Sequence, residues 1–162
     1  MANSKYVEYA LGRIKDIISA NLDAKLTAIE AEIGDGLDLM RPRATSYYIN
    51  EIEELDNLPA IVILPDTANI AIPGLTWDDT EYNIIVSGHV FSTSGKIDQC
   101  AKRAYRYARA IRELIIEYRT LSDTVVAWYA TGVNYGVMME DGNGFMQSIE
   151  INTVVKVQEC TI

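Results

Sequence analysis

Histidine and cysteine are the residues here best suited to nucleophilic chemistry, and both are scarce. His89 is the single histidine, and Cys100 and Cys160 are the two cysteines. A thiolate–imidazole pair between His89 and Cys100 is conceivable. However, Cys100 falls on the apolar side of a predicted helix, where burial favours the unreactive thiol. One histidine and two distant cysteines also make a poor zinc site. We therefore predict a protein that is not an enzyme, with no catalytic residue, metal or cofactor.

Two acidic clusters are the other candidates for chemistry. One comprises Glu51, Glu53, Glu54 and Asp56, and the other comprises Asp78, Asp79 and Glu81. Neither has the central glycine and terminal glutamate of a calcium-binding loop. Solvated loop charge is the simpler interpretation, with a loose divalent-ion contact as the alternative. The segment 142–144, Gly-Asn-Gly, lacks the lysine and the following helix of a phosphate loop, so we interpret it as a hairpin turn.

The most distinctive feature is a basic segment from Lys96 to Arg119. It holds seven positive and three negative residues, whereas the rest of the chain holds seven positive and twenty negative residues. Lys102, Arg106 and Arg109 fall largely away from its apolar stripe. Their stems could cover apolar surface while their heads stay in water. Alternatively, they could dock onto an acidic loop of a neighbouring copy, the head-to-tail contact that a ring of identical subunits requires.

Two amphipathic helices must position these residues. The first is predicted from a cap at Ser4 to about Ile33, with Gly34 ending it. At about 45 Å it is too long for a small sheet to cover, so part of it would project, kink near 21–23 or pack on a neighbour. The second follows a turn and cap at 93–95 and ends near 121–123. Its apolar stripe comprises Ile97, Cys100, Ala101, Ala104, Ala108, Ile111, Ile115 and Tyr118.

Strands are predicted between and after the helices. All four prolines fall between residues 35 and 74, which favours only short extended pieces at 46–50 and 60–64. Alternating apolar and polar residues at 80–92 predict a longer strand, whose polar side carries His89.

A long hairpin is predicted to complete the chain, with strands at 125–139 and 145–158 and a turn at 140–144. Gly132 and Gly136 indicate a bulge or a close backbone approach. The first strand is expected to place on one face Val125, Ala127, Tyr129, Val133, Tyr135, Val137 and Met139. Because such strands exceed the usual length, residues near the tip, namely Tyr135, Val137 and Met138, are candidate contacts with a neighbour.

Together these elements predict an α+β fold in a single domain over residues 1–162. An antiparallel (mixed at most) sheet would carry the C-terminal hairpin and two long helices on one face. The net charge of −9 disfavours general nucleic-acid binding. The beginning of the chain lacks the form of a signal peptide, and no apolar run reaches the roughly 18 residues that span a bilayer. We therefore expect a protein made in a cytoplasm, without membrane contact.

This order of elements resembles the tail terminator and tail-completion proteins of tailed bacteriophages. The similar features are a first helix, a proline-bounded strand at Leu58-Pro-Ala-Ile-Val-Ile63, a strand at Tyr82–Val90, a helix at Ile97–Tyr118 and a hairpin at Val125–Val157. The resemblance covers nearly the whole chain and includes no signature motif. It implies a structural virion protein that forms a homo-oligomeric ring, usually a hexamer, at the head–tail junction.

Such a ring would cap the tail tube protein and join it to the head-side connector, or neck, while DNA passes through its channel without specific binding. The resemblance carries over no catalytic residue and no cofactor. It places the protein in the virion tail or neck, after assembly in the host cytoplasm. The alternatives are a protein-binding adaptor and another neck component of a phage or of a contractile phage-like particle.

Overall fold

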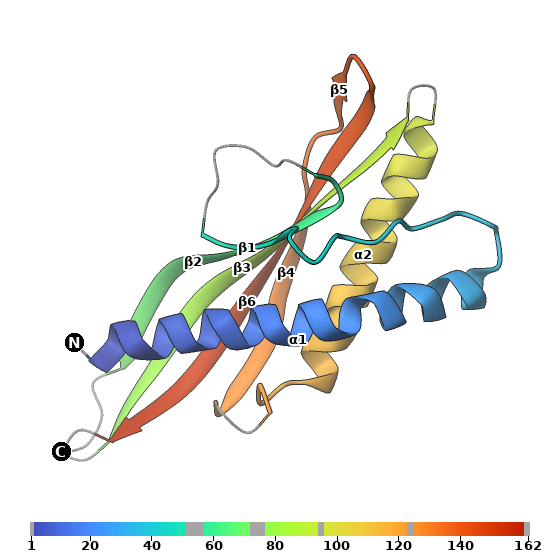
Figure 1. The fold of residues 1–162 in the computed structure, drawn as a ribbon. Helices are drawn as coiled ribbons and strands as arrows, with labels where there is room; N and C mark the ends of the chain where they lie inside the picture. Colours follow the sequence, from blue (N-terminus) through green and yellow to red (C-terminus); the bar gives the residue numbers. More distant parts are fainter. Residues whose placement is uncertain (1, 51–56, 72–76, 94–95, 123–124, 161–162) are drawn as a thin grey trace.

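The computed structural model describes residues 2–50, 57–71, 77–93, 96–122 and 125–160. Two helices lie on one face of a six-stranded sheet (Figure 1). The elements are α1 (Ala2–Ile33), β1 (Tyr47–Ile49), β2 (Ala60–Ala71), β3 (Trp77–Thr93), α2 (Ile97–Glu117), β4 (Ala127–Tyr135), β5 (Met139–Asp141) and β6 (Gly144–Cys160). The strand order is β1-β2-β3-β6-β4, and β5 also pairs with β6. Only the β1–β2 pair is parallel among these strands. The predicted α+β class is therefore confirmed.

The sheet is built on the pairing of β3 with β6. The two strands are antiparallel from the pair Trp77–Cys160 to the pair Thr93–Gly144. β6 comes last in sequence among the described strands and yet lies inside the sheet, between β3 and β4. Its predicted alternation is confirmed, because its inward side chains are all buried: Ile149, Ile151, Thr153, Val155 and Val157. β3 and β6 thus form the central strand pair on which the helices pack.

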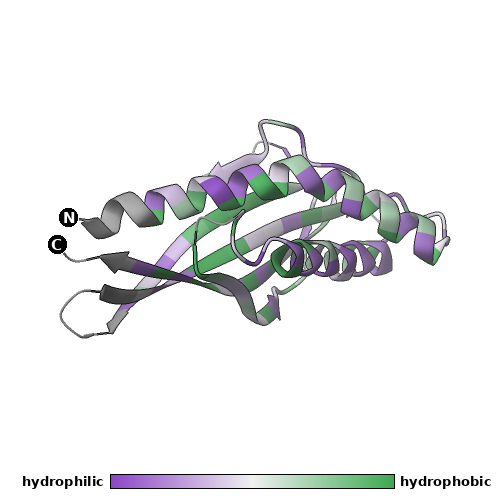
Figure 2. Ribbon diagram, turned by 90° about the horizontal axis from the view of Figure 1, so that it is seen from below, coloured by the Kyte–Doolittle hydropathy of each residue, from purple (hydrophilic) through white to green (hydrophobic). Residues whose placement is uncertain are grey.

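The core lies between this face of the sheet and the two helices. α1 buries a stripe at helical spacing: Leu11, Ile14, Ile18, Leu22, Leu26 and Ile29. α2 buries Cys100, Ala104, Tyr107, Ile111 and Leu114. In Figure 2 apolar residues recur at intervals along α1 and along the strands beneath it. Burial of these stripes, rather than helix propensity, is what stabilises long helices in a domain of this size.

The helix boundaries differ from the predictions at three points. α1 already begins at Ala2, so Ser4 lies within the helix and is not its cap. α2 begins after Lys96, which makes no side-chain capping hydrogen bond, and it ends at Glu117 instead of near 121–123. Positive φ angles at Leu121 and Ser122 then turn the chain. The predicted cap residues 94 and 95 lie outside the described residues.

The apolar stripes also stop short of the helix ends. Ile33, at the end of the predicted first helix, is 41% exposed, and Ile97, predicted to be on the apolar stripe of the second helix, is 51% exposed. α1 is continuous as a helix, and its C-terminal end extends past α2 (Figure 1). The projection expected of a helix too long for its sheet is therefore observed at that end.

β2 is longer than the predicted strand at 60–64. It continues to Ala71 through Pro65, with a register shift between Pro65 and Ala68. β1 pairs only with residues 61–63. Beyond that point the outer side of β2 has no strand partner among the described residues, so a proline there removes no hydrogen bond from a neighbouring strand.

The predicted strand at 125–139 is divided into β4 and β5, with residues 136–138 outside any strand. The bulge expected near Gly132 is confirmed as a register shift between Ala130 and Gly132. The close approach at Gly136 is also confirmed, because its N–H donates to the Ser148 carbonyl oxygen at 2.8 Å, and an added Cβ would clash with the Ser148 side chain. The turn at 142–143 joins β5 to β6, as predicted.

The bulge reverses which side chains point inward. Before it, Trp128 pairs with Val155 and is fully buried, while Tyr129 is 38% exposed. After it, Val133 pairs with the buried Ile151. One extra residue changes the parity of a strand. The prediction that Tyr129 and Val133 share a face is therefore wrong.

Candidate interaction surface

The basic residues of the Lys96–Arg119 segment separate into two sets by whether their side chains have a partner within the chain. Arg103, Arg106 and Arg109 face α1 and the connection between α1 and β1. Arg103 Nε donates to the Asp38 carbonyl oxygen at 2.8 Å. Arg106 is paired with Asp35, and Arg109 donates to Glu32 at 2.6 Å and to Glu113 at 2.8 Å. Arg106 and Arg109 are thus neutralised by carboxylates within the chain, whereas Arg103 is hydrogen-bonded to neutral oxygens only.

Arg106 departs most from the prediction that it lies in water. It is 8% exposed, and its two terminal nitrogens donate to the two carboxylate oxygens of Asp35. A bidentate guanidinium–carboxylate pair fixes both orientation and distance. Such a pair holds the pKa of Asp35 down, to about 2. Whether Arg106 or Arg109 contacts another subunit stays a prediction, since each already has a partner in its own chain.

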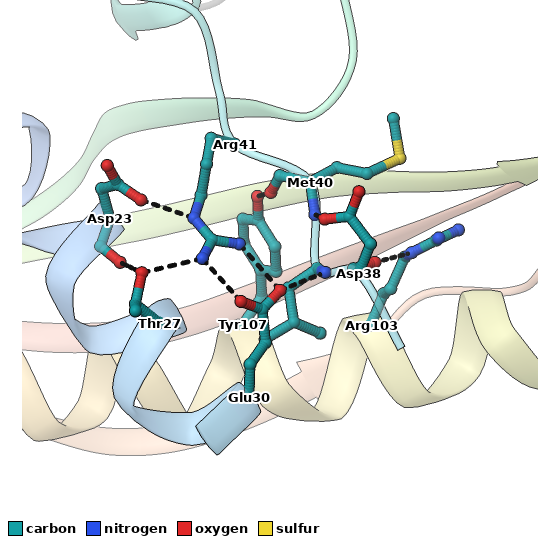
Figure 3. A network of polar contacts seen from close by, with 9 residues as sticks. Asp23, Thr27, Glu30, Asp38, Met40, Arg41, Arg103 and Tyr107 are labelled. Carbon is teal, nitrogen blue, oxygen red and sulfur yellow. Dashed lines mark hydrogen bonds and ion pairs between the residues drawn. The ribbon is translucent and has the colours of Figure 1, made fainter. Parts of the chain in front are cut away.

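The connection at residues 34–46, here called the strap, is held against both helices. Figure 3 shows Arg41 of the strap reaching Asp23, Thr27 and Glu30 of α1. Glu30 also accepts the Leu39 N–H at 2.6 Å. The Tyr107 hydroxyl of α2 donates to the Met40 carbonyl oxygen. The strap, a connection without secondary structure of its own, is thereby fastened at several points.

Acid should loosen the strap through Glu30. Hydrogen bonds from Arg41, and then from the Leu39 N–H, lower the pKa of Glu30 from 4.5 to about 2. The stabilisation is therefore complete above pH 4.5 and is lost as the pH falls towards 2. We expect the urea midpoint of the wild type to decline over this window. Glu30→Gln should have a lower midpoint at pH 6 and a shallower decline.

The control for this titration is Glu140→Gln, at an exposed hairpin position. It should reproduce the wild-type decline. An unchanged acid slope in Glu30→Gln would contradict the role assigned to the Arg41–Glu30 pair.

The second basic set consists of cations without a partner in the described part of the chain. Lys102, Arg112 and Arg119 form no side-chain ion pair or hydrogen bond with residues that the structure describes. Two of the three, Arg112 and Arg119, line a groove between α2 and the edge strand β4. This edge groove holds about 300 Å³ and is lined by Arg112, Ile115, Ile116, Arg119, Trp128, Tyr129 and Ala130. It is an apolar hollow with two unpaired cations at its rim.

Trp128, which lines the edge groove, has an unused hydrogen-bond donor. Its side chain is fully buried, and its indole nitrogen is buried without a hydrogen-bond partner. A buried donor that lacks a partner costs about 1–3 kcal/mol. An acceptor supplied from outside the chain would remove that cost.

A second apolar surface continues from the edge groove towards the hairpin. The Tyr105 and Tyr135 rings meet edge to face, with centroids 5.1 Å apart. Both are about half exposed, and beyond them Val137 is 85% exposed and Met139 is 59% exposed. We call these four residues the tip patch. Because β4 ends the strand order, both surfaces lie along an edge of the sheet, where backbone groups and apolar side chains are available to a partner.

The structure therefore rearranges the predicted contact set. Tyr135 and Val137 are exposed, as a contact would require, whereas Met138 packs against the core and its neighbour Met139 is exposed. Lys102 is exposed beside the strap. Sequence reasoning missed Tyr105, Arg112 and Ile116, although their spacing of seven and four residues places them on one face of α2. All of these contacts remain predictions.

The residues considered for catalysis lie apart. Cys100 packs in the core, with its Sγ 3.5 Å from the Phe145 carbonyl oxygen. His89 points to the other face of the sheet, where its Nε2 lies 3.1 Å from Ser87 Oγ. Burial raises the pKa of the Cys100 thiol and lowers the pKa of the His89 imidazole, so both neutral forms are favoured. The considered pair is not formed.

The described residues offer neither a metal site nor a membrane-spanning helix. Among them, no three histidine, cysteine, aspartate or glutamate side chains are arranged to hold a metal ion. None of their helices combines the length and the apolar character needed to cross a bilayer. The acidic cluster at 51–56 lies outside the described residues. In the second cluster, Glu81 pairs with Lys156 at 2.9 Å.

No family model matches the chain, and no curated protein matches it. Among solved structures, one described as the virion of a native gene transfer agent particle contains a similar chain. The TM-score is 0.47 at 13% sequence identity, over 88% of this chain and 95% of that chain. A likeness at this level establishes neither family nor function.

Proposed function

We propose that this protein is a structural virion subunit that assembles into a ring, with six copies expected, at a head–tail junction. The observation that carries the proposal is the combination of the edge groove and the tip patch along one edge of the sheet. Ile116, Tyr105, Tyr135, Val137 and Met139 are each between 47% and 85% exposed there. Exposed apolar residues gathered along an edge strand are typical of a protein–protein interface.

The charge distribution supports self-association. The segment from Lys96 to Arg119 is basic, and the rest of the chain holds twenty acidic residues against seven basic ones. A basic surface on one copy and an acidic surface on the next form a heterologous contact. Such contacts close into a ring when the rotation between copies allows it.

The ring size and the neighbours come from the resemblance drawn from the sequence. In this proposal the ring caps the tail tube protein and meets the head-side connector. DNA passes through the channel, and the net charge of −9 keeps phosphates from binding to the wall. In this proposal the protein acts by binding other protein subunits and not by catalysing a reaction.

Size measurement in solution tests the proposal. Size-exclusion chromatography with light scattering, at several concentrations and with and without a tail tube protein, should give a discrete species of about six times the 18.1 kDa chain mass. A strict monomer at high concentration, even beside the tail tube protein, would refute it.

An adaptor for an unrelated protein is the second candidate. The same edge groove favours it, since an edge strand beside an apolar hollow can also bind a segment of a different protein. A stable monomer that forms a defined one-to-one complex through this edge would support the adaptor and exclude the ring.

A further inference from the structure

We infer that the edge groove binds an acidic side chain from the next copy of this chain. This proposal rests on the ring described above. The acidic partner surface is the opposite edge of the sheet, beside β2. The inference adds to the ring proposal by assigning the two surfaces that meet and the charge that fixes their register.

The donors at the edge groove are the first argument. Arg112 and Arg119 have no side-chain partner among the described residues, in contrast to Arg106 and Arg109 on the same basic segment. Trp128 lines the same hollow, and its indole N–H is buried without an acceptor. A carboxylate is the protein group that can accept from guanidinium and indole donors together.

The lining of the edge groove favours a protein segment over nucleic acid. Apart from its two arginines, the groove is lined by Ile115, Ile116, Trp128, Tyr129 and Ala130. Aliphatic and aromatic side chains around a few charges form the usual centre of a protein–protein contact. A phosphate backbone would instead meet a chain of net charge −9.

The second copy is favoured by what its other edge presents. β2 lies near the end of the sheet opposite to β4. Asp66 of β2 is exposed there, and it lines a shallow hollow together with Val7 of α1. The next residue of α1, Glu8, is also exposed. Acidic side chains thus stand at one edge of the molecule and unpaired arginines at the other, as a head-to-tail contact requires.

Side chains, and not a shared backbone ladder, must carry this contact. The register of β2 shifts between Pro65 and Ala68, and that of β4 shifts between Ala130 and Gly132. Bulges and prolines prevent regular pairing at strand edges. The contact surfaces are therefore the edge groove on one copy and the exposed acidic residues beside β2 on the next.

Charge reversal tests the assignment. Arg112→Glu should raise the concentration at which the ring dissociates about tenfold or more, because it removes a partly buried charge pair and introduces repulsion. Arg43→Glu, at an exposed position of the strap, is the matched control. It makes the same charge change outside the edge groove and should shift the midpoint less than about twofold. Equal circular dichroism and thermal midpoints would establish that both variants are folded.

The acidic surface beside β2 is tested by swapping the two charges across the proposed contact. Asp66→Arg should weaken assembly as Arg112→Glu does, and combining the two substitutions in one chain should recover most of the lost assembly, because opposite charges again face one another across each contact. Trp128→Phe, which keeps an aromatic ring without the N–H, should weaken assembly by a smaller factor.

The outcomes separate this inference from the proposed ring. A wild-type monomer would defeat the ring. A wild-type ring that Arg112→Glu disturbs no more than Arg43→Glu does would overturn the groove assignment and leave the ring standing. Loss of binding to a short DNA duplex in Arg112→Glu, with assembly intact, would assign the groove to nucleic acid and likewise overturn the inference.

Discussion

Gly144→Ala should destabilise the fold by about 2–4 kcal/mol, since it combines backbone strain with overpacking. Gly144 is the first residue of β6 and has a φ of 155°. A Cβ at this position would clash with the Ser92 carbonyl oxygen and would lie 3.0 Å from Thr93 Cα. Those atoms belong to the backbone of the neighbouring strand, so no side-chain rotation relieves the clash. The thermal midpoint and the urea midpoint should both fall.

Gly142→Ala is the matched control, two residues earlier in the same turn. A Cβ at Gly142 would meet no atom within 4 Å. The same added methyl group should therefore change the urea midpoint only slightly. Equal losses in the two variants would mean that the turn tolerates alanine poorly everywhere, and that the contact with Ser92 is not the cause.

Tyr107→Ala should cost about 3–5 kcal/mol, the range for deleting a large buried aromatic side chain. Tyr107 is fully buried, and its hydroxyl donates to the Met40 carbonyl oxygen of the strap. Burial raises the pKa of this phenol, so it remains a donor well into the alkaline range. Tyr107→Phe keeps the ring but leaves the Met40 carbonyl oxygen without this donor, which should cost about 1–2 kcal/mol.

Hydrogen exchange separates the two roles of Tyr107. In Tyr107→Phe, faster exchange should be concentrated in the strap, whereas in Tyr107→Ala it should spread through the core. Tyr105→Phe, at a half-exposed position two residues earlier, is the control and should leave both stability and exchange unchanged. Uniformly faster exchange in Tyr107→Phe would contradict the proposal that the Tyr107 hydroxyl holds the strap in place.

Sequence periodicity predicted the elements whose environment is regular along their length. β3 and β6 each have a clear alternation, and α2 has a clear helical stripe, because each packs one face against a single layer. The hairpin turn was predicted because glycine and asparagine at 142–144 leave few alternatives. The sheet order could not be predicted in the same way, since placing β6 between β3 and β4 depends on contacts distant in sequence.

Two departures have specific causes. A single bulged residue between Ala130 and Gly132 reverses the inward side of β4, so the alternation before it and the alternation after it belong to different faces. The strap carries no periodic pattern, so the burial of Arg106 against Asp35 could not be predicted from the stripe of α2 alone. Charged residues are assigned to water by default, and only the fold reveals which of them meet a partner.

The candidate surface was predicted in part. The basic character of α2 and the hairpin tip were both recognised, but the cations singled out were Lys102, Arg106 and Arg109. The edge groove instead uses Arg112 and Arg119, which point towards β4. The spacing of Tyr105, Arg112 and Ile116 was available in the sequence. Only the fold shows that these three side chains lie beside the edge strand β4.

The position of β6 has a consequence for biosynthesis. As the ribosome makes the chain, β1, β2 and β3 emerge well before the strand that must lie next to β3, and β4 has no neighbour until β6 follows it. The nascent sheet thus remains in two halves, each with a bare hydrogen-bonding edge, until the final strand has left the exit tunnel. Translation of that last segment, or its retention by a chaperone, would set the earliest moment at which a subunit becomes competent to assemble.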